Sequence, residues 1–576
     1  MSAGHDRIAL DVRQWWRRWR IGGCPMPPFS THDAFGGLFG FMATTDSSSQ
    51  SSRPSDLIRI DPADNVAVTT VALAAGTTVR FDAGKLTLRQ PIPAGHKIAT
   101  QTIGAGDAVV RYGQTMGVAA ESIAAGDHVH DHNVGDAAGS TDLRSVRFRG
   151  GQSLPKRSRC FDGYVRRTSG VTRYGTRNYV AIVSTVNCSA TVAHRVAATV
   201  TPDVLAAYPN VDGVFAITHT SGCAMRHDGE KHRTLTRVLR GYLNHPNIGA
   251  AMVIGLGCEQ SDPTYLSGGV VPITNLDGRE LSGDPSARSR GDAIPMTTIQ
   301  TEGGTAKTIA RASQRIPDLL ASANLRTRQS IDAAHLIVAM ECGGSDAHSG
   351  ITANPILGGA GDRIIASGGR SVVSETTELS GAEHLLAARC RDRQIAETLY
   401  AKLRWWRRHV EHYGGRLDHN PSLGNKAGGL TTITEKSLGA VSKTGRETVA
   451  DVVDYAAPIA TPGLTIMDTP GFDPASVTGK IAGGANVVLF STGRGSCFGA
   501  KPVPVIKVAT TTKLFQTMRD DMDFDAGRRL DGVSADALSD ELFELTLRVA
   551  SGQTTASERL GLGDHEFVPW LVGPTL

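Results

Sequence analysis

Four short apolar runs, each closed by a cysteine, constrain the fold of this chain more than any other feature. The runs are VAIVSTVNC, VFAITHTSGC, AAMVIGLGC and HLIVAMEC, and they end at Cys188, Cys223, Cys258 and Cys342. Each is rich in Val, Ile and Ala and is bounded by Gly or Ser, which is typical of a strand buried on both faces of a parallel sheet. Because ligands bind beyond the carboxyl ends of such strands, the sequence predicts that the four thiols converge on one site.

Helix-like segments alternate with these runs from about residue 160 to the C-terminus. TVAHRVAATVTPDVLAAY follows the first run and HRTLTRVLRGYLNH the second, both with apolar residues at helical spacing. This alternation predicts an α/β region with right-handed crossovers. A chain of 576 residues is too long for one core, and a long helical segment before residue 415 indicates two subdomains, 160–415 and 416–576.

A different rhythm precedes the α/β region. Between residues 56 and 135, short alternating segments such as NVAVTTVAL and KLTLRQ are separated by Gly or Pro turns, which predicts a small all-β domain. Residues 136–159, rich in Gly, Ser and Arg, are the predicted linker. Residues 1–55 are expected to be a disordered extension or the product of a misassigned start codon, with Met42 as an alternative start.

Composition restricts the partners of the chain. It is 40% hydrophobic and 20% charged with a net charge of +4, which gives no electrostatic case for nucleic acid or membrane as the main partner. Only the basic segment RQWWRRWR, residues 13–20, leaves contact with a membrane surface as an alternative. Eight irregularly spaced cysteines do not resemble a secreted disulfide framework. We therefore expect a cytoplasmic protein with a small-molecule ligand, and the pattern allows a homo-oligomer.

The four cysteines are a candidate site for a soft metal. Convergent thiolates bind iron or an iron–sulfur cluster, and three of them would leave an open coordination place for a substrate. No CxxC pair is present, so the metal site is indicated only by the position of the cysteines at the ends of the apolar runs. The alternative is that a buried cysteine is only a small apolar side chain, as is often the case. Cys497 is a weaker fifth candidate, whereas Cys24, Cys160 and Cys390 have no predicted role.

Three histidines at alternate positions form a second candidate site. If HVHDHN is a strand, His128, His130 and His132 project from one face of it. Two of them, together with a carboxylate or His96, could bind a divalent metal or contact a substrate. The alternative is a solvated edge strand whose histidines have no function.

Two glycine-rich turns follow apolar runs and could bind an anion through backbone amides. They are ECGGSDAHSGITANP, which contains Ser345, Asp346 and Asn354, and FSTGRGSCFG, which contains Arg494. Neither matches a nucleotide-binding fingerprint, and tight turns alone would also explain the glycines.

The segment NPSLGNKAGGLTTITEKSLG contains the remaining polar candidates. A lysine with a lowered pKa could act as a general base beside a carboxylate, and a charged lysine could hold that carboxylate, although most lysines are merely solvated. The candidates are Asn425, Lys426, Glu435, Lys436 and, just beyond the segment, Lys443.

These motifs resemble those of a known family. GHKIATQTI, YGQTMGVA and GDHVHDHN are similar to the small SAF-type (β-clip) domain of the altronate and galactarate dehydratases. GTRNYVAIVSTVNCSA, HTSGC, VIGLGCE, ECGGSDAHSGITANP, NPSLGNKAGG, EKSLG and FSTGRGS resemble the catalytic region of that family, in the same order. The resemblance implies a SAF-like all-β domain followed by a large α/β catalytic region with Rossmann-like parallel sheets.

The resemblance also implies an activity. Members are lyases that use ferrous iron to remove water from a sugar acid and give a 2-keto-3-deoxy acid, from altronate or galactarate. Iron bound to the carboxylate and a hydroxyl would ease the loss of the C2 proton and of hydroxide from C3. Relatives include lyases for 3-sulfolactate, and a chain whose iron site had decayed could be a sugar-acid sensor, so both alternatives stay open.

The implied roles are assigned residue by residue. Iron, mononuclear or within a cluster, is assigned to Cys188, Cys223 and Cys258, with Cys342 as a fourth ligand or a nearby thiol, and His128, His130 and His132 could carry a second divalent metal. The predicted catalytic residues are Asp346 and a base, either His219 or Lys426, and the predicted substrate-binding residues are Arg177, Asn187, Arg494, Asn425, His128 and His130. His348 matches no role in the family's pattern.

Overall fold

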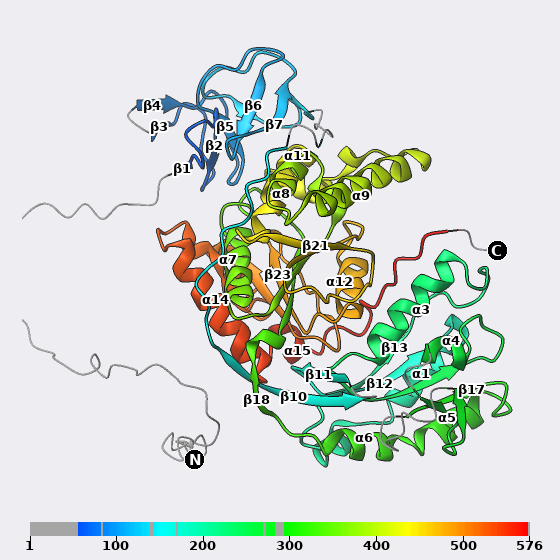
Figure 1. The fold of residues 1–576 in the computed structure, drawn as a ribbon. Coiled ribbons are helices and arrows are strands. Elements are labelled where there is room, and N and C mark those ends of the chain that lie inside the picture. Colours follow the sequence, from blue (N-terminus) through cyan, green and yellow to red (C-terminus); the bar gives the residue numbers. More distant parts are fainter. Residues whose placement is uncertain are drawn as a thin grey trace, which may run out of the picture. The chain divides into compact units, whose positions relative to one another are not determined.

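The computed structural model describes residues 56–81, 84–137, 143, 146–168, 171–268, 272–282 and 293–573 (Figure 1). The predictions for the N-terminal segment, including Met42, Cys24 and the RQWWRRWR stretch, lie outside these residues. Among the helices that the structure describes, none is both long and apolar enough to cross a membrane.

The predicted all-β domain is present. Its strands are β1 (Leu57–Ile58), β2 (Val66–Thr69), β3 (Thr78–Phe81), β4 (Gly84–Thr87), β5 (Lys97–Ala99), β6 (Ala108–Arg111), β7 (Gln114–Ala119), β8 (His128–Val129) and β9 (Val134–Gly135). They form antiparallel sheets in the orders β1-β2-β5-β8 and β6-β7-β9 and a β3-β4 hairpin. Gly95 and Gly126 have positive φ in tight turns, a conformation that side chains with a Cβ rarely adopt.

The segment predicted as a linker is bonded to the catalytic region. Gly151 N donates to Thr448 Oγ1 at 2.9 Å and Ser153 Oγ to Glu447 Oε2 at 2.7 Å. A Cβ at Gly151 would collide with the main chain at Thr448, so only glycine permits this close approach. Gly151 and Ser153 are therefore held against the catalytic region rather than belonging to a free tether.

A six-stranded sheet forms the first half of the α/β region. Its order is β13-β12-β14-β17-β15-β16, parallel except for β16. The strands are β12 (Tyr179–Ser184), β13 (Gly213–Ile217), β14 (Ile248–Gly255), β15 (Ile273–Thr274), β16 (Glu280–Ser282) and β17 (Ile294–Thr298), and the helices are α1 (Ala190–Ala197), α2 (Pro202–Ala206), α3 (Glu230–Leu243), α4 (Pro263–Ser267), α5 (Thr305–Ser313) and α6 (Ile316–Asn324). Beside it, β10 (Cys160–Thr168), β11 (Val171–Gly175) and β18 (Gln329–Asp332) form an antiparallel sheet in the order β11-β10-β18.

A second parallel sheet of seven strands follows, in the order β21-β22-β20-β19-β23-β24-β25. The strands are β19 (Ile337–Cys342), β20 (Arg370–Val373), β21 (Val449–Val453), β22 (Gly463–Met467), β23 (Val487–Thr492), β24 (Val505–Ala509) and β25 (Phe524–Asp525). The helices are α7 (Ala353–Ala366), α8 (Glu383–Ala387), α9 (Arg393–His412), α10 (Leu423–Ala427), α11 (Ile433–Val441), α12 (Asp473–Ala482), α13 (Thr512–Thr517), α14 (Ala535–Ala550) and α15 (Ala556–Arg559). In Figure 1, α7 and α14 lie together on one side of this sheet and α12 on the other.

The subdomain boundary predicted at residue 415 is wrong. Strands β19 and β20 precede it but pair with β23 and β22, which follow it, so the two sheets divide between β17 and β19. The long segment that suggested a boundary is α9. Its apolar residues, including Ile395, Leu399 and Trp406, are buried, so it covers the sheet rather than separating two domains.

The two parallel sheets share one core. Ala181 and Val253 of the first sheet belong to the same buried cluster as Val488 of the second. Helix α3 packs on α12, and a Cβ at Gly241 would collide with the main chain of Ala482. This close packing fixes the carboxyl edges of the sheets, where the predicted site residues lie.

Candidate functional site

Three of the predicted thiols follow neighbouring strands. Strands β13, β12 and β14 are adjacent and parallel, and Cys223, Cys188 and Cys258 lie just beyond their carboxyl ends. All three are exposed free thiols. Their sulfur atoms do not form a group that lies within 4.8 Å in the described part of the chain.

The loops that carry these thiols are bonded to one another. Asn187 N donates to Ser221 O at 2.9 Å, and Gln260 N donates to Gly222 O at 3.1 Å. His219 accepts from Ser221 N through Nδ1, and burial lowers its pKa to about 4, so its ring is neutral near pH 7. Its Nε2 is buried without a hydrogen-bond partner among the described residues. His219 and Asn187 therefore belong with the three thiols, at the edge of the six-stranded sheet.

Cys342 does not join them. It ends β19 in the other sheet, is buried, and its Sγ lies 2.8 Å from Ser345 Oγ. Burial raises the pKa of this thiol. The prediction of one site with four thiols is wrong, because the sequence does not show which sheet each apolar run enters.

Arg177 is also misassigned as a substrate-binding residue. Its Nε and Nη2 donate to the Glu558 carboxylate, and the other three donors bond to the carbonyl oxygens of Thr176, Val549 and Gln553. The side chain is only 2% exposed. With all five donors used, Arg177 anchors the C-terminal helices to the start of β12 and has none left for a ligand.

Asp346 lies in the loop after β19, at the carboxyl edge of the seven-stranded sheet. Its carboxylate accepts hydrogen bonds from Ser349 N at 2.8 Å, Ser349 Oγ at 3.0 Å and Thr510 Oγ1 at 3.1 Å. Burial alone would raise its pKa, but His348 and these donors outweigh burial and hold the pKa below its ordinary value. Asp346 is therefore a buried, ionised acceptor.

Arg494 meets the same loop from β23. Its backbone N–H and that of Gly493 donate to Gly344 O at 2.8 and 3.1 Å. Gly493 faces the Asp346 carboxylate so closely that a Cβ would collide with it. The Cβ position of Gly428 lies 3.0 Å from Asp346 Cβ and 3.2 Å from Arg494 Cδ. Two loops and the segment that carries Lys426 thus meet around Asp346 and Arg494.

Asn425 holds that segment in place. Its Nδ2 donates to Ser345 O at 2.8 Å, and its Oδ1 accepts from Lys436 Nζ at 3.4 Å. Lys436 also donates to Glu378 at 2.7 Å and Asn420 at 2.9 Å. Since its amide is occupied by these contacts, Asn425 positions the loop, which differs from the substrate-binding role predicted for it.

The histidines of the β domain lie over the same segment. His96 Nδ1 and His128 Nε2 are 2.9 Å apart, and the ring centroids of His96, His128 and His130 are separated by 4.9–5.4 Å. His96 Nε2 lies 3.4 Å from Ala427 O, and His130 Nδ1 lies 3.1 Å from Thr431 Oγ1. Residues about 300 positions apart in the sequence therefore form one cluster.

The histidines gather for a different reason than the one predicted. The strand covers only His128 and Val129, and the chain then turns, so it is the turn that brings His130 and His132 next to His128. Burial and neighbouring positive charges lower the pKa of His128 to about 3 and that of His130 to about 4. These rings are therefore neutral near pH 7, which is the state that binds metals.

Lys426 lies beside the histidine cluster. Its Nζ is 3.3 Å from Asp131 Oδ2, and Asp131 Oδ1 is 3.9 Å from His130 Nε2. Burial alone would raise the pKa of Asp131, but His130 and Lys426 lower it below its ordinary value. Lys426 keeps a side-chain exposure of 30%, so a ligand can reach its amine.

A buried ion-pair triad joins the β domain to the catalytic region. Glu435 on α11 pairs with Lys97 Nζ at 2.9 Å and with Arg111, and all three side chains are at most 1% exposed. Lys97 also donates to Gly429 O and Arg111 to Ala347 O at 2.7 Å. One carboxylate thus holds two cations from the β domain against the loops that form the candidate site.

His348 is a site residue whose role the sequence did not reveal. It is 5% exposed, its Nδ1 lies 3.6 Å from Asp346 Oδ2, and its Nε2 is buried without a hydrogen-bond partner among the described residues. Its Cε1 lies 3.1 Å from the Cβ position of Gly95, next to His96. The one signal in the sequence was its departure from the family's motif.

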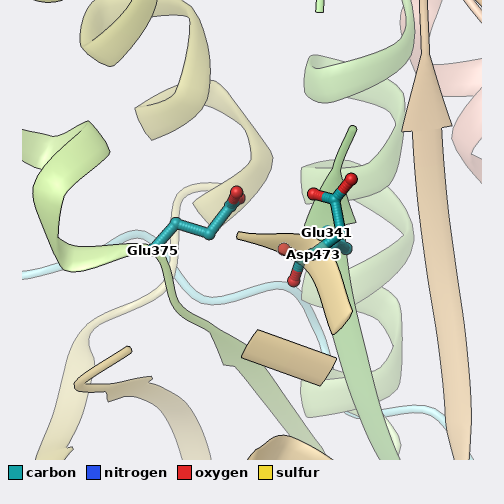
Figure 2. Close-up of side chains that lie close together, drawn as sticks. All are labelled: Glu341, Glu375 and Asp473. Atoms are coloured by element: carbon teal, nitrogen blue, oxygen red, sulfur yellow. The ribbon is translucent and has the colours of Figure 1, made fainter. Parts of the chain in front are cut away.

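Three further carboxylates lie beneath this site (Figure 2). Ligand atoms of Glu341, Glu375 and Asp473 all lie within 4.8 Å of one another. Lys480 pairs with Glu341 and Lys443 with Glu375, so two ammonium groups already offset most of the negative charge. Burial and the Glu375 charge raise the pKa of Asp473 to about 7 and that of Glu341 to about 8. The group therefore retains a proton, and no further cation is required to balance it.

Three domain families match consecutive parts of the chain. The altronate/galactarate dehydratase SAF domain matches residues 55–137, the second domain of D-galactarate dehydratase/altronate hydrolase matches residues 163–324, and the C-terminal domain of D-galactarate/altronate dehydratase matches residues 333–575. An altronate dehydratase from Escherichia coli (strain K12) is 35% identical over 87% of this chain and 96% of its own length. This chain belongs to the altronate/galactarate dehydratase family.

Other members of the family show its range. A galactarate dehydratase (L-threo-forming) from Escherichia coli (strain K12) is 34% identical over 88% of this chain and 95% of its own length. A (2R)-sulfolactate sulfo-lyase subunit beta from Chromohalobacter salexigens is 33% identical over 72% of this chain and 97% of its own length. The SAF-like domain and the α/β architecture expected from the sequence are confirmed.

Proposed function

We propose that this chain is an iron-dependent sugar-acid dehydratase that removes water from altronate or galactarate to give a 2-keto-3-deoxy sugar acid. The observation that carries the proposal is the meeting of His96 and His128 with the Lys426 segment and the Asp346 loop. Side chains of the types that bind metals and carboxylates thus come together from three segments distant in the sequence, which supports the proposal. The names of the dehydratase relatives supply the substrate class.

The histidines fit a metal ion. Two neighbouring ligands about 2.1 Å from an octahedral ion stand about 3.0 Å apart, and His96 Nδ1 and His128 Nε2 are separated by 2.9 Å. Burial lowers the pKa of both rings, which keeps them in the neutral, ligating state. We assign the ferrous ion to His96 and His128, because these two with His130 do not form a set of three ligand atoms within 4.8 Å of one another in the described part of the chain. When bound there it supplies a Lewis acid for the carboxylate and a hydroxyl group of the substrate.

The chain's own residues then perform the remaining tasks. Arg494 holds the substrate carboxylate through its planar guanidinium, and ionised Asp346 orients a substrate hydroxyl. Lys426 is the base that takes the proton from C2 as hydroxide leaves C3, so the elements of water are lost. The resulting enol moves its hydroxyl proton to C3 and becomes the 2-keto acid. His219, the other predicted base, lies at the edge of the other sheet and takes no part in this step.

The test is a direct assay of anaerobically purified, iron-supplemented protein. Altronate, galactarate and 3-sulfolactate are offered in parallel, and formation of 2-keto acid is measured. We expect turnover of one of the sugar acids, with at most slow release of sulfite from 3-sulfolactate. Preferred turnover of 3-sulfolactate would instead indicate a sulfo-lyase. Binding of the acids without turnover of any, with iron present, would indicate a sugar-acid sensor.

The three exposed thiols are proposed as a second place for iron, as an iron–sulfur cluster. A single tetrahedral ion with bonds of about 2.3 Å would need sulfur atoms about 3.8 Å apart. Cys188, Cys223 and Cys258 do not form a group within 4.8 Å, which favours a cluster over one ion. A free Nε2 on His219 nearby offers a hydrogen-bond donor to such a centre.

Replacing Cys188 by Ser is expected to remove most acid-labile sulfide and its associated iron from the anaerobic protein, because serine is a poor ligand for these centres. Metal and sulfide analysis with the visible absorption spectrum is the measurement. Cys390→Ser is the matched control, since Cys390 is buried, bonds to Leu386 O, and has a pKa raised to about 12 by burial. Equal iron and sulfide in both variants would contradict the assignment.

A further inference from the structure

A basic cleft lies on the side of the molecule away from the candidate active site. Its volume is about 1080 Å³, and it is bordered by β11, helices α3 and α4, and the segments that lead into β19, β20 and β23. Five arginines line it: Arg173, Arg233, Arg237, Arg240 and Arg370. None of the described residues that line the cleft is Asp or Glu. The cleft therefore concentrates positive charge in a chain that is almost neutral as a whole.

The guanidinium groups in the cleft are incompletely neutralised. Burial lowers the pKa of Arg173 and Arg370, and neither forms an ion pair with a residue that the structure describes. Burial also lowers the pKa of Arg240, whose guanidinium donates to the carbonyl oxygens of Tyr265 and Leu266 and not to a carboxylate. A cation that is partly removed from water without a counter-ion is unfavourable, and a bound anion would offset that cost.

The other two arginines have limited compensation. Arg233 is exposed and lies 3.6 Å from Asp228 Oδ1, and Arg237 donates to Tyr455 O at 3.1 Å. These contacts leave part of the donor capacity of both groups free, since each guanidinium carries five N–H donors. The planar arrangement of those donors suits phosphate and carboxylate oxygens.

Aromatic rings complete the lining. Tyr174 and His335 stack with their centroids 3.6 Å apart, and Tyr265 on α4 also lines the cleft. Burial lowers the pKa of His335, and it lowers that of His245 to about 4, so both imidazoles are neutral near pH 7. Both ring nitrogens of His245 are already bonded, to Asn247 N and Ala485 O, so the positive charge and the free donors of the cleft come from the arginines.

Strand direction separates this cleft from the candidate active site. Ile337, at the amino end of β19, lines the cleft, and Cys342, at the carboxyl end, borders the Asp346 loop. Five residue steps along a parallel strand cover about 17 Å. A substrate held by Arg494 and the histidines cannot reach the arginines of the cleft at the same time.

We propose that this cleft is a second ligand site, which binds a small organic molecule carrying several phosphate or carboxylate groups. Its volume of about 1080 Å³ lies just above the usual range of small-molecule sites, so it accommodates a ligand larger than a single inorganic anion. The proposal does not depend on the identity of the substrate, because no residue of the candidate active site contributes to the cleft.

The test measures binding to the full chain by titration calorimetry, with pyrophosphate and citrate as separate probes. We expect saturable one-to-one binding of at least one probe, and the preferred probe shows whether the site selects phosphate or carboxylate. The double variant Arg173→Ala/Arg370→Ala is expected to weaken that binding by about tenfold or more, because two charge-assisted contacts are lost. Arg393→Ala, an exposed arginine on α9 that pairs with Glu397, is the matched control and is expected to change binding by less than about twofold.

A second variant distinguishes a loss of ligand contacts from a loss of folding. Arg370→Lys keeps the charge but loses the planar donor set, and is expected to bind the preferred probe more weakly than the parent chain and more tightly than the double variant. The rise in Tm that the probe produces is expected to follow the same order. Absence of saturable binding of both probes, or binding that the arginine substitutions leave unchanged, would overturn the proposal.

Discussion

Replacing His128 by Gln is expected to lower kcat/KM by about 100-fold or more and to reduce the iron content of the protein loaded anaerobically with ferrous ion. Mutation of residues that merely orient metal ligands commonly lowers metal affinity or activity by about 10–100-fold, so loss of a ligand itself should lower activity at least as much. His128 Nε2 lies 2.9 Å from His96 Nδ1, and glutamine cannot replace this paired imidazole arrangement. The measurements are steady-state kinetics on the preferred sugar acid and metal analysis of the same samples.

His412→Gln is the matched control for this experiment. His412 ends α9 and its ring contacts Tyr413 rather than any residue of the candidate site. We expect activity and iron content close to those of the parent chain. If His128→Gln retained full activity and iron, the histidine cluster would not be the metal site, and the thiol loops would be left as the place for catalytic iron.

Replacing Glu435 by Gln is expected to destabilise the chain by about 3–5 kcal/mol, because it leaves two buried cations without their shared carboxylate. Lys97 and Arg111 are at most 1% exposed and cannot recover hydration without separating the β domain from α11. The urea concentration at the midpoint of unfolding is the measurement. Faster proteolytic release of residues 56–135 is expected from the same variant.

Glu397→Gln provides the comparison for an exposed ion pair. Glu397 pairs with Arg393 on the surface of α9 at 2.9 Å, with both side chains more than half exposed, and its loss is expected to change stability by at most about 1 kcal/mol. The Glu435 effect should also depend on pH. Burial alone would raise the pKa of Glu435, but Lys97 and Arg111 lower it below its ordinary value. The ionised carboxylate therefore stabilises the folded chain fully at pH values above the pKa that Glu435 has in the unfolded chain. This stabilisation is lost as the pH falls through the lower pKa of the folded chain. Equal destabilisation by both substitutions would contradict the role of the triad.

The sequence predicted individual strands well, because a buried parallel strand leaves a local pattern. VAIVSTVNC became the fully buried β12, and HLIVAMEC became β19. Membership of a sheet has no local pattern, since it depends on which strands pair across hundreds of residues. For that reason Cys342 was placed with the other thiols, and α9 was interpreted as a boundary between domains.

Side-chain roles were predictable only where the family motif and the local geometry agree. Asp346 and Arg494 come from separate motifs and lie around Gly428, in the segment that carries Lys426. The histidines gather through a turn and not on the strand face that was predicted. Arg177 could not be interpreted correctly, because its partner Glu558 is 381 positions away along the chain. The buried carboxylates Glu341 and Glu375 could likewise not be predicted from the sequence, since their lysine partners come from α12 and from the turn after α11.

The buried triad and the bonded linker have a consequence for assembly. A relative of this chain is named as one subunit of a lyase, whereas here the β domain and the catalytic region are parts of a single polypeptide. A short connection confines two partners at an effective concentration in the millimolar range, so their docking becomes an intramolecular equilibrium. Dilution of the protein therefore does not separate the histidines from Lys426 and Asp346.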